Sequence, residues 1–161
     1  MPLLTQEKAL RSLRKTPGIL RAVLRGVDQQ TAASLTDGPD GWNVVFIVCH
    51  VADYEMIYTE RVRRILNEEE PQFDSPMDND EMPIAHRYAE QQLSHMVGVF
   101  EERRRKFIAL IESLNEEQLA RRGYHPVSGY GTALDYAINA ALHDVNHIEQ
   151  ITKVLKIGEG F

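Results

Sequence analysis

Three histidines carry the clearest chemical information in this sequence. His143 and His147 are four residues apart within a long segment of helical apolar periodicity, so on a helix they lie on one face, one turn apart. Two imidazoles in this arrangement can reach a single metal ion. The same face continues through Tyr136, Ala140 and Val154, which indicates that the pair points toward a core and not toward water.

His50 is the third candidate ligand. On a predicted helix it shares a face with Phe46, Tyr54 and Ile57. A buried imidazole is unfavourable unless it is hydrogen-bonded or bound to a metal. Three neutral nitrogen ligands leave a divalent ion its full charge and at least one position for water or substrate. Such a site can lower the pKa of a bound water or thiol and can polarise a carbonyl group.

Two carboxylates are candidate catalytic groups. Asp144 directly follows His143, as a glutamate general base follows the first histidine in the His-Glu-x-x-His zinc hydrolases. Its side chain is one methylene shorter, so a supporting or surface role is an equal alternative. Asp53, one turn after His50, could orient that imidazole or assist proton transfer.

Tyr54 and Arg61 are the candidate substrate-binding residues. Both lie on the predicted face of His50, and Arg61, at its far end, could bind a substrate carboxylate. The remaining histidines are weaker ligand candidates. His95 neighbours predicted core positions, while the other two lie near a helix start and in a loop, at His86 and His125.

Four helical segments account for most of the chain. Thr16-Pro17 resembles an N-cap followed by proline at the first helical position, which predicts a helix over 16–27, with one or two helical turns allowed over 5–14. Asn43 is a plausible N-cap for a second helix over 44–68. Its opening, 44–48, could pass for a strand, but the apolar pattern continues for too long.

The second half of the sequence predicts two more helices. Residues 69–82 contain prolines and many carboxylates and show no helical periodicity, which predicts a connecting segment. A segment of this length, when extended, can cross the length of a bundle. The third helix is predicted to begin near Pro83, and Asn115 with Gln118 resembles a capping pair. Residues 123–131 read as a loop, after which Thr132 begins a fourth helix that reaches about residue 156.

Composition narrows the class of protein. The 161 residues fit a single domain, 1–161, and 18 Lys+Arg against 24 Asp+Glu give a net charge of −6. This balance argues against nucleic acid and anionic membrane surfaces as partners. The one basic run, 103–106, reads as a solvated helix face. Cys49 is the only cysteine, which fits the cytoplasm, and we expect neither a signal peptide nor a membrane span.

Several stretches together resemble the DinB-like (DinB/YfiT-like) superfamily of metalloenzymes. They include Thr16 to Leu24, Trp42 followed by Val-Val-Phe-Ile-Val-Cys-His50-Val-Ala-Asp53-Tyr54, then Arg61, Gly129 to Thr132, and His143-Asp144-x-x-His147-Ile148-x-Gln150. The resemblance runs in order over most of the chain. It implies an all-α four-helix bundle of up-down-down-up topology, a divalent ion on His50, His143 and His147, and a homodimer.

The resemblance also implies a range of functions. Nickel or zinc is the favoured ion, with iron or manganese as alternatives. The favoured function is a metal-dependent enzyme of stress or detoxification, either an S-transferase using a small thiol cosubstrate or a small-molecule hydrolase. The alternative is a non-catalytic stress or ligand-binding protein whose metal joins two helices. A third possibility is that the histidines are core residues without an ion.

Overall fold

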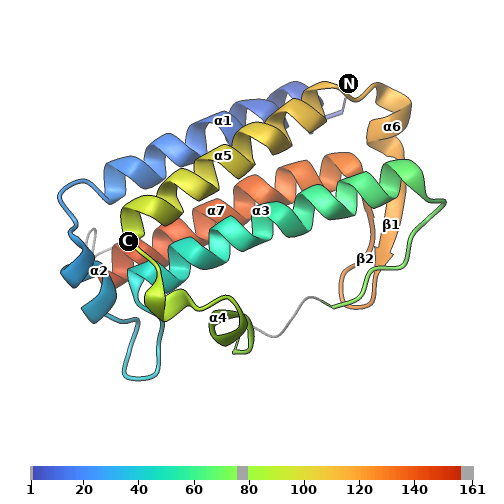
Figure 1. Cartoon of the computed structure of the whole chain (residues 1–161). Coiled ribbons are helices and arrows are strands. Elements are labelled where there is room, and N and C mark those ends of the chain that lie inside the picture. Colours follow the sequence, from blue (N-terminus) through green and yellow to red (C-terminus); the bar gives the residue numbers. More distant parts are fainter. Residues whose placement is uncertain (1, 76–79, 157–161) are drawn as a thin grey trace.

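Four long helices form the body of the protein in the computed structural model, which describes residues 2–75 and 80–156 (Figure 1). They are α1 (Gln6–Val23), α3 (Val44–Asn67), α5 (Leu93–Glu112) and α7 (Ala133–Val154). Shorter elements connect them: α2 (Gln29–Ser34), α4 (Met82–Ala85), the 3-10 helix η1 (Tyr88–Glu90), α6 (Glu116–Ala120), β1 (Arg122–His125) and β2 (Gly129–Thr132). None of the described helices is both long and apolar enough to cross a bilayer.

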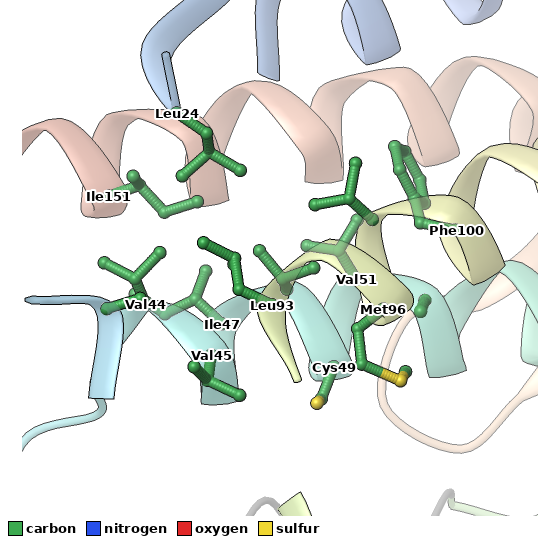
Figure 2. Close-up of a cluster of buried hydrophobic side chains, with 14 of the residues drawn as sticks. Leu24, Val44, Val45, Ile47, Cys49, Val51, Leu93, Met96, Phe100 and Ile151 are labelled. Atoms are coloured by element: carbon green, nitrogen blue, oxygen red, sulfur yellow. The ribbon is translucent and has the colours of Figure 1, made fainter. Parts of the chain in front are cut away.

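The helices form the predicted four-helix bundle of up-down-down-up topology. α3 and α5 run side by side in one direction, while α1 and α7 run in the other (Figure 1). One buried cluster therefore joins the ends of two helices to the starts of two others, as Leu24, Ile151, Val44 and Leu93 show (Figure 2). The chain between α3 and α5 returns along the bundle, and residues 76–79 of the predicted connection lie outside the described residues.

The predicted start of the first helix is wrong. α1 begins at Gln6, with the Thr5 side chain accepting a hydrogen bond from the Lys8 amide, and Pro17 lies inside the helix. Proline has no N–H to donate to the carbonyl four residues earlier, so Leu13 loses a helical hydrogen bond. Arg104 replaces it, since a guanidinium nitrogen donates to the Leu13 carbonyl at 3.0 Å. A tertiary contact thus makes the proline tolerable.

The cap predictions for the other helices are confirmed. Asn43 accepts a hydrogen bond from the amide of Phe46, and α3 is helical from Val44 onward, so the strand alternative is excluded. Thr132 and Asp135 form a capping box at the start of α7, as Asn115 and Gln118 do at α6. Each box satisfies two backbone N–H groups that the helix itself leaves unpaired.

Two later predictions need correction. The third long helix begins at Leu93 and not near Pro83, which lies in the short α4. Between them the left-handed conformation of Arg87 (φ 55°) interrupts the helical path. The segment 123–131 is not a plain loop but an antiparallel hairpin in which Tyr124 pairs with Tyr130. Glycine at 129, with φ 77°, supplies the turn conformation that other residues rarely adopt.

Four buried polar residues join all four long helices at mid-height. Arg104 of α5 is 1% exposed and binds both carboxylate oxygens of Glu55 on α3. The same guanidinium donates to the hydroxyl of Thr16 on α1 and pairs with Asp144 on α7 at 2.7 Å. The prediction that the whole basic run 103–106 is a solvated face is therefore wrong at Arg104. We refer to Thr16, Glu55, Arg104 and Asp144 as the arginine cluster.

Candidate metal centre

The three histidines predicted as ligands converge on one point between α3 and α7. Nε2 of His143 lies 3.2 Å from Nε2 of His50 and 3.1 Å from Nε2 of His147. Their nitrogen atoms form a group that could hold a metal ion, with all ligand atoms within 4.8 Å of one another. His50 is buried, and the other two rings are half-buried. We refer to these three residues as the histidine cluster.

The donor set fits a divalent cation. Nitrogen ligands about 2.0–2.1 Å from an ion in tetrahedral geometry lie roughly 3.3 Å apart, close to the separations in the cluster. His147 offers a lone pair at Nε2, because its Nδ1 donates to the Oε1 of Gln150 at 2.8 Å. The convergence involves Nε2 of His50, while its Nδ1, on the other side of the ring, is buried without a hydrogen-bond partner among the described residues. Three imidazoles directed at one point are best satisfied by a cation.

The electrostatics of the cluster keep the imidazoles neutral. Burial, followed by the neighbouring His147, lowers the pKa of His50 to about 3. Burial and the two other rings lower the pKa of His143 to about 2, and burial also lowers the pKa of His147. Metal ligation requires the unprotonated ring. The protein therefore presents the three nitrogens in their ligating form at neutral pH.

Aromatic rings surround the histidine cluster. The Trp42 ring lies 5.0 Å from the ring of His50, while Tyr54 stacks on His143 with ring centroids 4.5 Å apart. Tyr58 lies edge-on to His143, and its hydroxyl accepts a hydrogen bond from Asn139. Burial raises the pKa of Tyr54, so this candidate substrate-binding residue keeps its proton and can act as a donor.

Asp53 does not contact the histidine cluster through a hydrogen bond. Its carboxylate accepts from Nδ1 of His86 at 2.6 Å and from the hydroxyl of Tyr88 at 2.7 Å. Arg103 forms a third contact at 3.3 Å. These contacts fasten the segment between α4 and α5 onto α3. The imidazole that Asp53 orients is that of His86, and not the predicted His50.

Asp144 points away from its neighbour His143. Its carboxylate pairs with Arg104 and accepts a hydrogen bond from the hydroxyl of Thr16. The residue is 2% exposed, whereas a general base must reach a water or substrate beside the ligands. The contacts of Asp144 are those of a structural ion pair and give no support to a general-base role.

The last predicted site residue, Arg61, lies at the hairpin end of the bundle. Its guanidinium carbon is 5.7 Å from the ring centroids of both Phe73 and Tyr136. The three weaker histidine candidates lie outside the cluster. His86 binds Asp53, His95 is exposed on α5, and His125 is buried in the hairpin.

The sequence of this chain matches a known protein family. The model of the DinB superfamily matches residues 12–151, which include all three histidines and most of the bundle. The chain belongs to the DinB superfamily. This membership was predicted from the tryptophan, the single histidine of α3 and the paired histidines of α7.

Similar proteins of known structure have the same four-helix fold. YfiT of Bacillus subtilis (strain 168), named as a putative metal-dependent hydrolase, is 28% identical over 151 residues, which are 92% of this chain and 83% of YfiT. The solved structure of YfiT, a probable metal-dependent hydrolase with an unusual four-helix bundle topology, matches with a TM-score of 0.84 at 24% identity, over 94% of this chain and 86% of that one. The four-helix bundle protein TT2238 matches with a TM-score of 0.68 at 19% identity, over 92% of this chain and 99% of that one.

Sequence reasoning missed several residues around this DinB-superfamily site. Gln150 was named as part of the family resemblance, and its contact with His147 depends on a side-chain geometry that spacing does not give. The hydrogen bond between Tyr58 and Asn139 crosses between two helices, so no pattern within one segment indicates it. The arginine cluster gave no sequence signal, because Arg104 stands within a run of charged residues.

Proposed function

We propose that the protein is a divalent-metal-dependent enzyme that acts on small molecules, with His50, His143 and His147 as the ligands. One observation carries the proposal, namely the convergence of three Nε2 atoms with neighbouring separations of 3.1 and 3.2 Å. Nickel or zinc is the proposed ion, since imidazole nitrogen suits both, and iron or manganese are the alternatives. With three protein ligands, a position remains for substrate or water.

Hydrolysis of a small substrate is the proposed reaction. Similarity to YfiT, whose solved structure is described as that of a probable metal-dependent hydrolase, supports this choice. A divalent ion in such a site supplies Lewis acidity, which favours the deprotonated form of a water or thiol and polarises a carbonyl group.

The residues around the cluster have separate tasks in this proposal. Gln150 holds the ring of His147 so that its Nε2 faces the other two histidines. Trp42 and Tyr54 cover two sides of the rings and restrict access of bulk water. The protonated hydroxyl of Tyr54 is available as a hydrogen-bond donor to an oxygen of the substrate.

A second reaction uses the same site. Transfer of a small thiol to an electrophile needs a thiolate near the ion, and the resemblance to the DinB-like superfamily favours it. We place either reaction in stress response or detoxification, in a cytoplasmic homodimer that binds neither nucleic acid nor membranes. The net charge of −6 supports the absence of a nucleic-acid partner. Light scattering of the purified protein would test the dimer.

The experiment compares the metal-free protein with protein reconstituted with zinc or nickel. Two assays are run, hydrolysis of 4-nitrophenyl esters and conjugation of small thiols to monochlorobimane. We expect turnover only with metal, and its loss in His143→Ala but not in Asn146→Ala, an exposed position on the same helix.

Each reaction and the non-catalytic alternative give different results in this experiment. Ester cleavage without conjugation supports the hydrolase, and conjugation without cleavage supports thiol transfer. Metal binding that raises the melting temperature without turnover in either assay would support a structural metal. Equal activity of His143→Ala and Asn146→Ala would contradict the proposal.

A further inference from the structure

Arg61 has no acidic partner among the described residues, although the protein carries a net negative charge of −6. The adjacent acid, Glu60, is exposed and forms no ion pair with Arg61. Of the acids one or two turns away on the same helix, Glu55 pairs with Arg104 and Glu68 with Arg64. Among the residues that the structure describes, no carboxylate forms an ion pair with Arg61. An unpaired, half-buried guanidinium retains its capacity to bind an anion.

Two aromatic rings hold this guanidinium in place. Phe73 and Tyr136 are perpendicular to each other, with ring centroids 5.8 Å apart, and each ring lies 5.7 Å from the guanidinium carbon of Arg61. Contacts of this kind are favourable and reduce the number of positions that the side chain samples. The cation is therefore partly ordered before any ligand binds.

His125 adds a second donor from the hairpin. Its Nδ1 accepts from the backbone amides of Val127 and Ser128 at 3.2 and 3.4 Å, so the proton of the neutral ring resides on Nε2. His125 lies on the same face of β1 as Gly123, where an added Cβ atom would be 2.5 Å from the Phe73 ring, so His125 is beside the rings that contact Arg61. Burial, followed by the positive charge of Arg61, lowers the pKa of His125, which keeps the ring neutral. His125 is 9% exposed. It follows the strand residue Tyr124, whose carbonyl accepts from the amide of Phe73.

Buried aromatic side chains, Tyr58 (2% exposed) and Tyr136 (7% exposed), connect this pair to the histidine cluster. Tyr58 lies between the two sites, with its ring centroid 5.8 Å from His143 and 6.4 Å from Tyr136. Tyr136 precedes His143 by two helical turns of α7, which corresponds to a separation of about 10 Å along the helix axis. Arg61 is three turns past His50 on α3, and helical side chains lean toward the N-terminus, that is, toward His50.

From this arrangement we infer that Arg61 and the Nε2–H of His125 form a subsite for a carboxylate at the far end of an extended substrate. The planar guanidinium matches the two oxygens of a carboxylate, and the single positive charge matches a monoanion better than a phosphate dianion. The substrate class is thus an apolar, extended molecule about 10 Å long, with the reacting group at the histidines and a carboxylate at Arg61. This inference rests on the proposed function for its reacting end only.

Binding is tested first on the metal-free protein, so that the result does not depend on catalysis. Octanoate and its uncharged analogue octanamide are titrated into labelled protein, and the amide signals of the hairpin 122–132 are followed by NMR. We expect octanoate to bind at least tenfold more tightly than octanamide. Arg61→Gln should remove that preference, and Arg61→Lys, which keeps the charge without the planar fork, should retain part of it.

A matched pair of variants tests the histidine. His125→Gln keeps an amide donor in place of the ring, whereas His125→Phe keeps a ring and removes the donor, so the first should bind octanoate more tightly than the second. Circular dichroism checks that all variants are folded. Equal affinity for octanoate and octanamide, affinity unchanged within twofold in Arg61→Gln, or no octanoate binding at all would overturn the inference.

The catalytic arm separates failure of the subsite from failure of the proposed function. Zinc-loaded protein is assayed with mono(4-nitrophenyl) suberate and with 4-nitrophenyl octanoate, which differ in the terminal carboxylate. We expect a KM at least tenfold lower for the suberate, and loss of the difference in Arg61→Gln. Cleavage of both esters with equal KM would refute the subsite. Cleavage of neither, with octanoate binding intact, would refute only the proposed hydrolase.

Discussion

The histidine cluster and the arginine cluster are neighbours in the sequence but opposite in design. His143 belongs to one and Asp144 to the other, and these adjacent residues of α7 point to different sides of the helix. In the arginine cluster, the guanidinium of Arg104 donates to acceptors on all three other long helices. In the histidine cluster, three nitrogen atoms that can act as acceptors lie within 4.8 Å of one another.

The difference separates a structural joint from a ligand site. A buried charge is tolerated when partners within the protein neutralise it, and Arg104 has two such carboxylates. Burial disfavours its charged form, but the contacts with Glu55 raise the pKa of Arg104 nevertheless. The nitrogen atoms of the histidine cluster have no such charged partner within the described residues, and a bound metal ion would supply one. Removing a member should therefore strongly destabilise the fold in the case of the arginine cluster and abolish metal binding in the case of the histidine cluster.

The largest effect is expected from Arg104→Met. This change leaves Glu55 and Asp144 buried without their cation and leaves the Leu13 carbonyl without a donor. Loss of one partner from a buried ion pair costs about 3–5 kcal/mol in the free energy of unfolding. Urea denaturation measures it, with the exposed Arg105→Met as control. A loss as small as that of the control would show that the cluster is not a joint.

Metal addition should give the next largest effect. Because the ion binds the folded chain, an excess of 1,000 times its Kd should stabilise the protein by about 4 kcal/mol. The same addition should leave the stability of His143→Ala unchanged, since one of three ligands is missing. Chemical denaturation with and without zinc gives both values. Equal stabilisation of the two proteins would place the metal elsewhere.

Acid should destabilise the metal-free protein through the histidine cluster. The folded-state pKa values of His50 and His143 lie near 3 and 2, below the usual value of 6.5, so the unfolded chain binds more protons between these limits. Stability then falls as the pH decreases below about 6.5, by at most ~1.4 kcal/mol per pH unit for each histidine. Urea unfolding at pH 7 and pH 5 measures the slope, which His143→Gln should reduce. A slope unchanged by that substitution would contradict the account.

The smallest effect concerns Gln150. Its removal in Gln150→Ala frees the ring of His147 without removing a ligand, and loss of such a supporting hydrogen bond typically weakens metal affinity about 10- to 100-fold. Calorimetric titration with zinc measures the change, and Glu149→Ala, the exposed neighbour, serves as control. Identical affinities of these two variants would remove Gln150 from the site.

The sequence predicted the features that depend on local spacing and capping. Four apolar stripes, the caps at Asn43 and Thr132 and the i, i+4 histidine pair are local patterns, and the bundle topology followed from family resemblance together with a long connection. The prediction that His50 faces His143 and His147 depends on how two helices pack together. The family resemblance implied that packing, and the apolar helix faces of these histidines agreed with it.

The sequence failed where a distant contact overrides a local preference. A proline inside a helix usually ends or kinks it, because its nitrogen has no hydrogen to donate. Pro17 is tolerated because Arg104, 87 positions later, donates to the Leu13 carbonyl that the proline leaves free. Asp144 and Asp53 lie beside ligand histidines in sequence, yet Arg104 and His86 determine where their carboxylates point. Such partners come from other helices, so no spacing rule within one segment could identify them.

The central claim is that three imidazoles bind one divalent ion. X-ray absorption at the zinc edge of protein loaded with one equivalent of zinc tests it most directly. The account predicts three imidazole nitrogens at about 2.0–2.1 Å from the ion, and a loss of one of them in His50→Ala. A spectrum with fewer than three imidazole ligands, or one that His50→Ala leaves unchanged, would contradict it.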